Sequence, residues 1–150
     1  MGYGPSRPDV PRGGPSLSHE FHDFMIDGAG KVWHGIRAYA ILRSVLSGLR
    51  VEGAINIGVE LSYGFINRIE NCNFIGSSVG IKSANQANAV VIANNNFEGQ
   101  SFAAIIVGNS QGGMVIEGNE MEGIGGPAII IFGMTSVLCH KFLPPYHTAR

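Results

Sequence analysis

The sequence has little charge, little cysteine and no long apolar run. Charged residues make up only 14% of the chain, and ten basic residues nearly balance eleven acidic ones. Such a chain has no cationic field that would attract nucleic acid or anionic lipid, so we expect neither as a partner. No apolar run approaches the roughly 18 residues of a membrane-spanning helix, so no membrane span is expected.

The two cysteines, Cys72 and Cys139, are widely separated, and no CxxC pair or other metal-ligand spacing accompanies them. We expect two free thiols that behave as small apolar residues, with a single disulfide as the alternative. The segment MGYGPSRPDVPRGGPSL lacks the apolar core of a secretory signal, so no signal peptide is predicted. The residues themselves therefore leave the compartment open.

Glycine, in contrast, is abundant. The 150 residues include 22 glycines, about twice the usual share, and 45% of the chain is hydrophobic. This composition suits short strands joined by tight corners around an ample core, and it suits a helical bundle poorly.

A short repeat runs through most of the chain. An apolar residue, a variable residue and a glycine recur about every two dozen positions, as Ile26-Asp27-Gly28, Val51-Glu52-Gly53, Phe74-Ile75-Gly76, Phe97-Glu98-Gly99 and Met121-Glu122-Gly123. Regular recurrence of this kind is typical of solenoid proteins, in which each repeat stacks on the next.

Two further apolar patterns run in step with the triplet. One recurs at a constant interval, at Ile57, Ile81, Ile105 and Ile129, and two positions further on stand Val59, Ser83, Val107 and Ile131. We expect both sets to stack as inward-facing rows, because strand side chains alternate between faces. A weaker pattern relates residues 90–92 to 114–116. Three short strands per repeat predict a coil with a triangular cross-section.

Asparagines gather at one corner of this expected coil. The repeat places Asn71 over Asn94 and Asn73 over Asn96, and it places Cys72, Asn95 and Asn119 in one row. Asparagine accepts left-handed backbone, and its amide can bond to neighbours above and below, so we interpret these residues as a structural stack. A sugar-binding or glycosylated corner is the alternative, although no N-x-S/T sequon occurs among them.

The triplets and the asparagine corner resemble the pectin-lyase-like superfamily and its parallel β-helix repeats, over roughly residues 24–138. The resemblance implies an all-β fold, a right-handed parallel β-helix solenoid, and an extracellular or surface location. The repeats of this chain amount to about four to five coils. It does not specify an activity, because similar proteins include lyases, hydrolases, epimerases, adhesins and scaffolds. The Asn-Thr-Asp, Gly-His-Gly and Arg-Ile-Lys signatures of the similar polygalacturonases are missing here.

Three segments are expected. Residues 1–20 are rich in proline and glycine and are expected to be disordered, residues 21–138 form the β-helix, and residues 139–150 form an irregular tail, which is either a cap or a truncated coil. Residues 36–49 are ambiguous. Their apolar residues have helical spacing, which predicts a short N-terminal capping helix, but Leu46 and Val51 also fit a further coil against Ile69 and Phe74.

The candidate site residues come from the variable position of the triplet, which should point outward. Glu52, Glu98 and Glu122 occupy this row, and Lys82 is a fourth candidate for ligand binding. Glu98 and Glu122 belong to adjacent repeats, so their α-carbons should lie about 4.8 Å apart. The pair is therefore a candidate for weak calcium binding. No other cofactor is expected. An ordinary solvated row is the alternative.

A second outward row contains Gly58, Lys82, Ile106 and Ile130, and Phe132 extends it. Its apolar end, Ile106, Ile130 and Phe132, is either covered by the tail or available for self-association. The leading functional hypothesis is a non-catalytic β-helix module that binds carbohydrate, polysaccharide included, or serves in surface architecture. The alternative is a fragment of a polysaccharide lyase, hydrolase or epimerase whose active coils lie outside this chain. No catalytic residue is identified.

Overall fold

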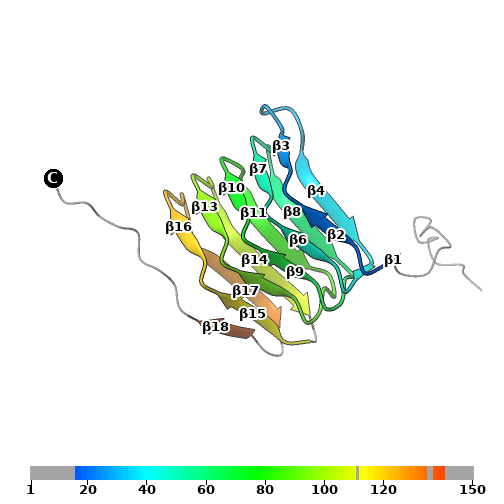
Figure 1. Cartoon of the computed structure of the whole chain (residues 1–150). Helices are drawn as coiled ribbons and strands as arrows, with labels where there is room; N and C mark the ends of the chain where they lie inside the picture. The colour runs from blue at the N-terminus through cyan, green and yellow to red at the C-terminus, as the bar shows by residue number, and fades with distance from the viewer. Residues whose placement is uncertain (1–15, 111, 135–136, 141–150) are drawn as a thin grey trace, which may run out of the picture.

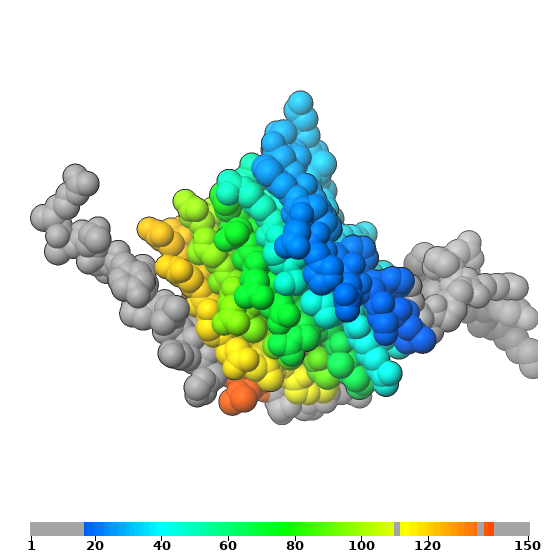
Figure 2. All heavy atoms as spheres, viewed as in Figure 1, coloured from blue at the N-terminus to red at the C-terminus, as the bar shows by residue number. Residues whose placement is uncertain are grey.

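The computed structural model describes residues 16–110, 112–134 and 137–140 (Figure 1). Throughout these residues the chain forms strands, turns and bends and no helix. The strands wind into about five successive coils, which lie side by side from the N-terminal to the C-terminal end of the molecule (Figure 2). The structure is therefore the expected all-β solenoid.

Three parallel sheets run the length of the solenoid. Sheet I contains β2 (Glu20–His22), β6 (Val45–Ser47), β9 (Arg68–Glu70), β12 (Val91–Ala93), β15 (Met114–Glu117) and β18 (Val137–His140). Sheet II contains β3 (Met25–Asp27), β7 (Arg50–Glu52), β10 (Asn73–Ile75), β13 (Asn96–Glu98) and β16 (Glu120–Glu122). Sheet III contains β4 (His34–Tyr39), β8 (Ile57–Ser62), β11 (Val79–Ala84), β14 (Ala103–Ser110) and β17 (Ile129–Met134). A small pair, β1 (Ser16–Leu17) with β5 (Ile41–Leu42), completes the strands.

The ambiguous segment 36–49 is a coil and not a helix. It contributes β5, β6 and the end of β4, and Leu46 is aligned with Ile69 as the coil alternative requires. The strands also extend slightly past the expected range of 21–138, because β1 and β2 begin before it and β18 ends after it. Residues 1–15 and 141–150 lie outside the described residues.

The triplet register is confirmed in full. Parallel pairing aligns one residue from each coil of sheet II in a single row: Ile26, Val51, Phe74, Phe97 and Met121. The glycines that follow turn the corner toward sheet III with φ between 64° and 69° at Gly53, Gly76, Gly99 and Gly123. A side chain is strained in this left-handed region, which explains the glycine in these four triplets.

The expected row through Ile57 is wrong in one coil. Ile81, Ile105 and Ile129 are aligned as predicted, but the residue that pairs with Ile81 is Val59, while Ile57 pairs with Val79. The connection from sheet II to sheet III is one residue longer in the second coil, residues 53–56, than in the third, residues 76–78. A constant interval in the sequence therefore does not correspond to a constant register.

Two stacked phenylalanines are part of the core. Phe74 and Phe97 are both fully buried, and their rings stack with centroids 5.1 Å apart and an interplanar angle of 15°. Met121 continues the row as a partly buried residue packed against the core. Stacking of equivalent residues follows from the parallel spacing of about 4.8 Å between coils.

Buried amides connect the coils at the corner between sheets I and II. The Asn95 side chain accepts a hydrogen bond from the Cys72 backbone N–H (3.0 Å) and donates one to the Ile69 carbonyl (3.0 Å). One coil further on, the Asn119 side chain accepts from the Asn95 backbone N–H (3.0 Å) and donates to the Ile92 carbonyl (2.9 Å). The expected row of Cys72, Asn95 and Asn119 is confirmed, and it satisfies backbone groups that the corner removes from the sheets.

Phe97→Ala should destabilise the solenoid by about 3–5 kcal/mol, as large aromatic truncations in packed cores do. A loss of that size is comparable to the whole stability of many small domains, so we expect the variant to be largely unfolded. Urea unfolding followed by circular dichroism measures this. Coincident midpoints for variant and parent would mean that Phe97 does not pack in the core.

Asn95→Ala should cost about 1–3 kcal/mol, because it leaves a buried N–H and a buried carbonyl without partners. Asn96→Ala is the matched control: its side chain is only partly buried and forms no hydrogen bond within the described residues. Thermal unfolding of both variants provides the comparison. Equal melting temperatures would show that the buried amide ladder adds nothing to stability.

Candidate functional site

The outer face of sheet III is shaped by an interruption of the strand alternation. A Cβ atom on Gly58 would lie 3.0 Å from Cδ1 of Phe74, so this position faces the core. The next residue, Val59, is also part of the core cluster. Because two consecutive residues face inward, the residues on either side of them, Ile57 and Glu60, both belong to the outer face. Ile57 was expected in the inward row, but it lies outside the core cluster although it is itself buried.

The interruption is built into the sequence of successive coils. The equivalent positions are Gly35, Gly58, Gly80 and Ala104, and the ladder skips each of them. A Cβ on Gly80 would lie 2.5 Å from Cδ1 of Phe97 and 2.7 Å from the Ala104 carbonyl oxygen. A larger side chain therefore cannot fit while the phenylalanine stack is in place.

Glu60 is the centre of a charged cluster on this face. Its side chain is only 7% exposed, and its Oε2 lies 3.1 Å from Nε of Arg37 and 3.5 Å from Nε2 of His34. Its Oε1 lies 3.5 Å from Nζ of Lys82. Arg37, Glu60 and Lys82 are direct neighbours in the ladder of β4, β8 and β11. Two cations thus hold one carboxylate in a fixed position.

Two tyrosines lie beyond the charged cluster at the end of the same strands. Tyr39 shares its strand and its face with Arg37, and its ring centroid is 5.0 Å from that of Tyr63 at an interplanar angle of 50°. The two residues are 48% and 47% exposed. Exposed, paired aromatic rings next to a fixed carboxylate provide both an apolar surface and hydrogen-bonding groups.

The expected outer row of sheet III needs one correction. The neighbour of Lys82 is Glu60 and not Gly58, because the shorter connection before β11 shifts the ladder register between these two coils. Sequence reasoning missed Glu60, Arg37 and His34 for the same reason, since the constant sequence interval points from Lys82 back to Gly58. The glycines that recur at the start of these strands were the available signal for the interruption.

The acidic row on sheet II has the predicted order but is not connected to Lys82, which is on sheet III. Ladder pairing aligns Glu98 with Glu122, and Ile75 separates Glu98 from Glu52. Glu52 is engaged locally, with Oε2 2.7 Å from Nη2 of Arg50. Glu98 and Glu122 are exposed and form no ion pair within the described residues. Of the four candidate ligand-binding residues, the solenoid therefore brings only Glu98 and Glu122 together.

Metal and thiol chemistry have few candidates. Across the residues that the structure describes, no group of three or more His, Cys, Asp and Glu side chains is arranged to hold a metal ion. Calcium binding by Glu98 and Glu122 stays a prediction. Cys72 and Cys139 are both free, as expected, and burial raises the pKa of the Cys72 thiol above its usual value.

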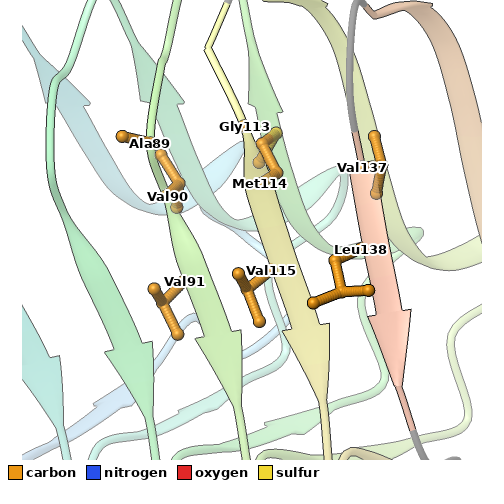
Figure 3. Close-up of a pocket in the computed structure, with 8 residues that line it drawn as sticks. All are labelled: Ala89, Val90, Val91, Gly113, Met114, Val115, Val137 and Leu138. Atoms are coloured by element: carbon orange, nitrogen blue, oxygen red, sulfur yellow. The ribbon is translucent and has the colours of Figure 1, made fainter.

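Two grooves lie on the other faces. The outer face of sheet I has an apolar depression of about 430 Å³, in which Val91, Val115 and Leu138 lie side by side across three strands (Figure 3). The corner between sheets I and II has a second groove of about 330 Å³, called the asparagine groove below, which is lined by Asn71, Asn73, Asn94, Asn96, Gly118 and Glu120.

The apolar end of the sheet III face is present as expected. Ile106 and Ile130 are neighbours on β14 and β17 and are partly buried, and Phe132 is 42% exposed. Self-association through these residues stays a prediction. No helix long and apolar enough to cross a membrane occurs in the part of the chain that the structure describes.

Comparison with known proteins identifies a family. A family model described as a right handed beta helix region matches residues 20–137. The matched segment covers nearly all of the described coils. Searches of curated proteins and of solved structures found no match.

Calcium titration tests the acidic pair. We expect the parent protein to bind Ca²⁺ with at most millimolar affinity, as two exposed carboxylates with a few neighbouring oxygens would, and Glu98→Gln to abolish the signal. Glu117→Gln removes an exposed carboxylate outside the row and is the matched control. Calorimetric traces that are flat for all three proteins would assign Glu98 and Glu122 to the solvated surface.

Proposed function

Because the chain belongs to the right-handed β-helix family, we propose that it is a non-catalytic β-helix module that binds carbohydrate through the outer face of sheet III. The observation that carries the proposal is the combination of the exposed Tyr39–Tyr63 pair with the buried carboxylate of Glu60, held by Arg37 and Lys82.

Each part of this face suits a sugar. The ring faces of Tyr39 and Tyr63 offer apolar surface to the C–H groups of a pyranose, and their hydroxyls remain available to water or ligand. Glu60 accepts hydrogen bonds from sugar hydroxyls, and Arg37 and Lys82 donate them. A sugar that spans both features would contact an apolar platform and a few fixed polar groups, which is the usual composition of a small-molecule site.

The side chains of the site are also pre-organised for binding. Glu60 is restrained by three neighbouring side chains, and its strand lies between two others in a continuous ladder. Binding to side chains that are already held in place requires less ordering than binding to mobile loops, which favours useful affinity from a shallow surface.

The same face supports the non-catalytic assignment. Glu60 is the only acidic residue in the five strands of sheet III. Most glycoside hydrolases use two carboxyl groups on either side of the scissile bond, one as an acid and the other as a base or nucleophile. A single carboxylate that is paired with two cations fits a binding role better than this chemistry.

A glycan array with neutral and acidic polysaccharide fragments, followed by calorimetry on each hit, tests the proposal. We expect Tyr39→Ala combined with Tyr63→Ala to weaken binding at least about tenfold, which corresponds to about 1.4 kcal/mol, and Glu60→Gln to weaken it as well. Phe102→Ala removes an equally exposed aromatic residue from a different coil and should leave affinity unchanged. Binding that is equally strong in all variants would place the glycan elsewhere.

An enzyme whose active residues lie within this chain would give a different result in the same samples. Reducing-sugar and unsaturated-product assays on the array hits should show no turnover, with or without calcium. Turnover that survives repurification and disappears in Glu60→Gln would replace the binding module with an enzyme.

A further inference from the structure

We propose that the asparagine groove is a second binding site, which takes an uncharged, hydroxyl-rich ligand of the neutral oligosaccharide class. It lies at the corner between sheets I and II and shares no residue with the face of sheet III. The inference therefore goes beyond the proposed function and depends on different side chains.

The groove has two layers of asparagines with different roles. Asn95 is buried, and its side-chain amide forms hydrogen bonds in the ladder that joins the coils. Asn71, Asn73, Asn94 and Asn96 surround it at the surface, and their side chains form no hydrogen bond within the described residues. The structural role expected for this corner therefore explains the buried layer and leaves four free amides in the outer one.

Backbone conformation accounts for only half of the outer layer. Asn71 and Asn94 have φ of 55° and 54°, a left-handed conformation that asparagine tolerates better than most residues. Asn73 and Asn96 begin the strands β10 and β13, where asparagine is disfavoured. Two aligned asparagines at positions that favour β-branched residues, without internal partners, indicate a role outside the fold.

The chemistry of the groove determines the ligand class. Each free amide offers two donors and one acceptor, which matches a sugar hydroxyl that both donates and accepts. Glu120 continues the row of Asn73 and Asn96 and adds a carboxylate that can accept from two neighbouring hydroxyls. Equivalent amides repeat at the strand spacing of about 4.8 Å, so an extended chain of sugars can meet the same groups in successive coils.

Rigidity favours recognition by these weak groups. The buried ladder fixes the backbone directly beneath the groove, with Asn95 bonded to both neighbouring coils. The outer amides therefore project from a fixed lattice, and a ligand does not have to order the chain when it binds. No aromatic ring lines the groove, so we expect weak, millimolar-class affinity.

Protein-observed NMR is the suitable test at this affinity. Isotope-labelled protein is titrated with hexasaccharides of β-1,4-glucan, β-1,3-glucan, xylan and mannan after removal of metal ions. We expect saturable shifts of the side-chain amide signals of Asn73 and Asn96 with at least one of them. Asn73→Thr combined with Asn96→Thr should weaken binding at least about tenfold, because threonine suits the strands and lacks the amide.

Three controls separate the possible outcomes. Asn56→Thr changes a partly exposed asparagine at another corner and should leave the shifts unchanged, and Asn96→Thr alone is used if the double variant does not fold. The Tyr39→Ala and Tyr63→Ala variant should retain binding in the groove, so failure of the sheet III site is seen separately. No shift with any hexasaccharide, or shifts unaffected by the asparagine variants, overturns the inference. A response to CaCl₂ alone would instead identify a cation site of amide and carboxylate oxygens.

Discussion

The spacing between neighbouring parallel strands, about 4.8 Å, constrains every other feature of this molecule. Each coil places its side chains directly above those of the previous coil, so a residue that suits one position tends to recur at the next. The apolar row that contains Phe74 and Phe97, the glycines with positive φ and the buried amides of Asn95 and Asn119 all follow this rule. The core, the corners and the outer rows are therefore not independent, because each is a column of equivalent positions that the same stacking holds together.

Columns of this kind also make the outer surface an ordered array. On sheet III the column of Arg37, Glu60 and Lys82 alternates in charge, so each member stabilises its neighbour. The nearly buried Glu60 carboxylate therefore lies between two cations. On sheet II the column of Glu98 and Glu122 repeats charge of one sign and stays exposed. The same geometry thus produces a fixed polar group on one face and an exposed acidic row on another. The difference lies in which side chains are stacked.

One local departure from regular strand geometry gives sheet III its character. Gly58 and Val59 both face the core, and position 58 has no room for a side chain because the Gly80 carbonyl and the Phe74 ring lie there. Ile57 and Glu60, three positions apart, consequently share the outer face. His34 is aligned with Ile57, and its side chain is therefore close enough to contact Glu60. Packing inside the solenoid therefore decides which side chains meet on its surface. The candidate site depends on the core although no core residue contacts solvent there.

The amino-acid sequence by itself determined the repeat, the inward row of the triplet, the buried amide corner and the order of the acidic row, because each is marked by residues that recur at nearly constant intervals. It also predicted that Ile81, Ile105 and Ile129 stack, and it left residues 36–49 open between helix and coil, because apolar spacing at one end of a solenoid is compatible with both. Only the tertiary structure decided that Val59 and not Ile57 stacks on Ile81, and that Glu60 and not Gly58 neighbours Lys82. The physical reason is that corner lengths differ by a residue between coils and that a glycine can interrupt the strand alternation, so the facing of a side chain depends on what it packs against and not on its interval alone.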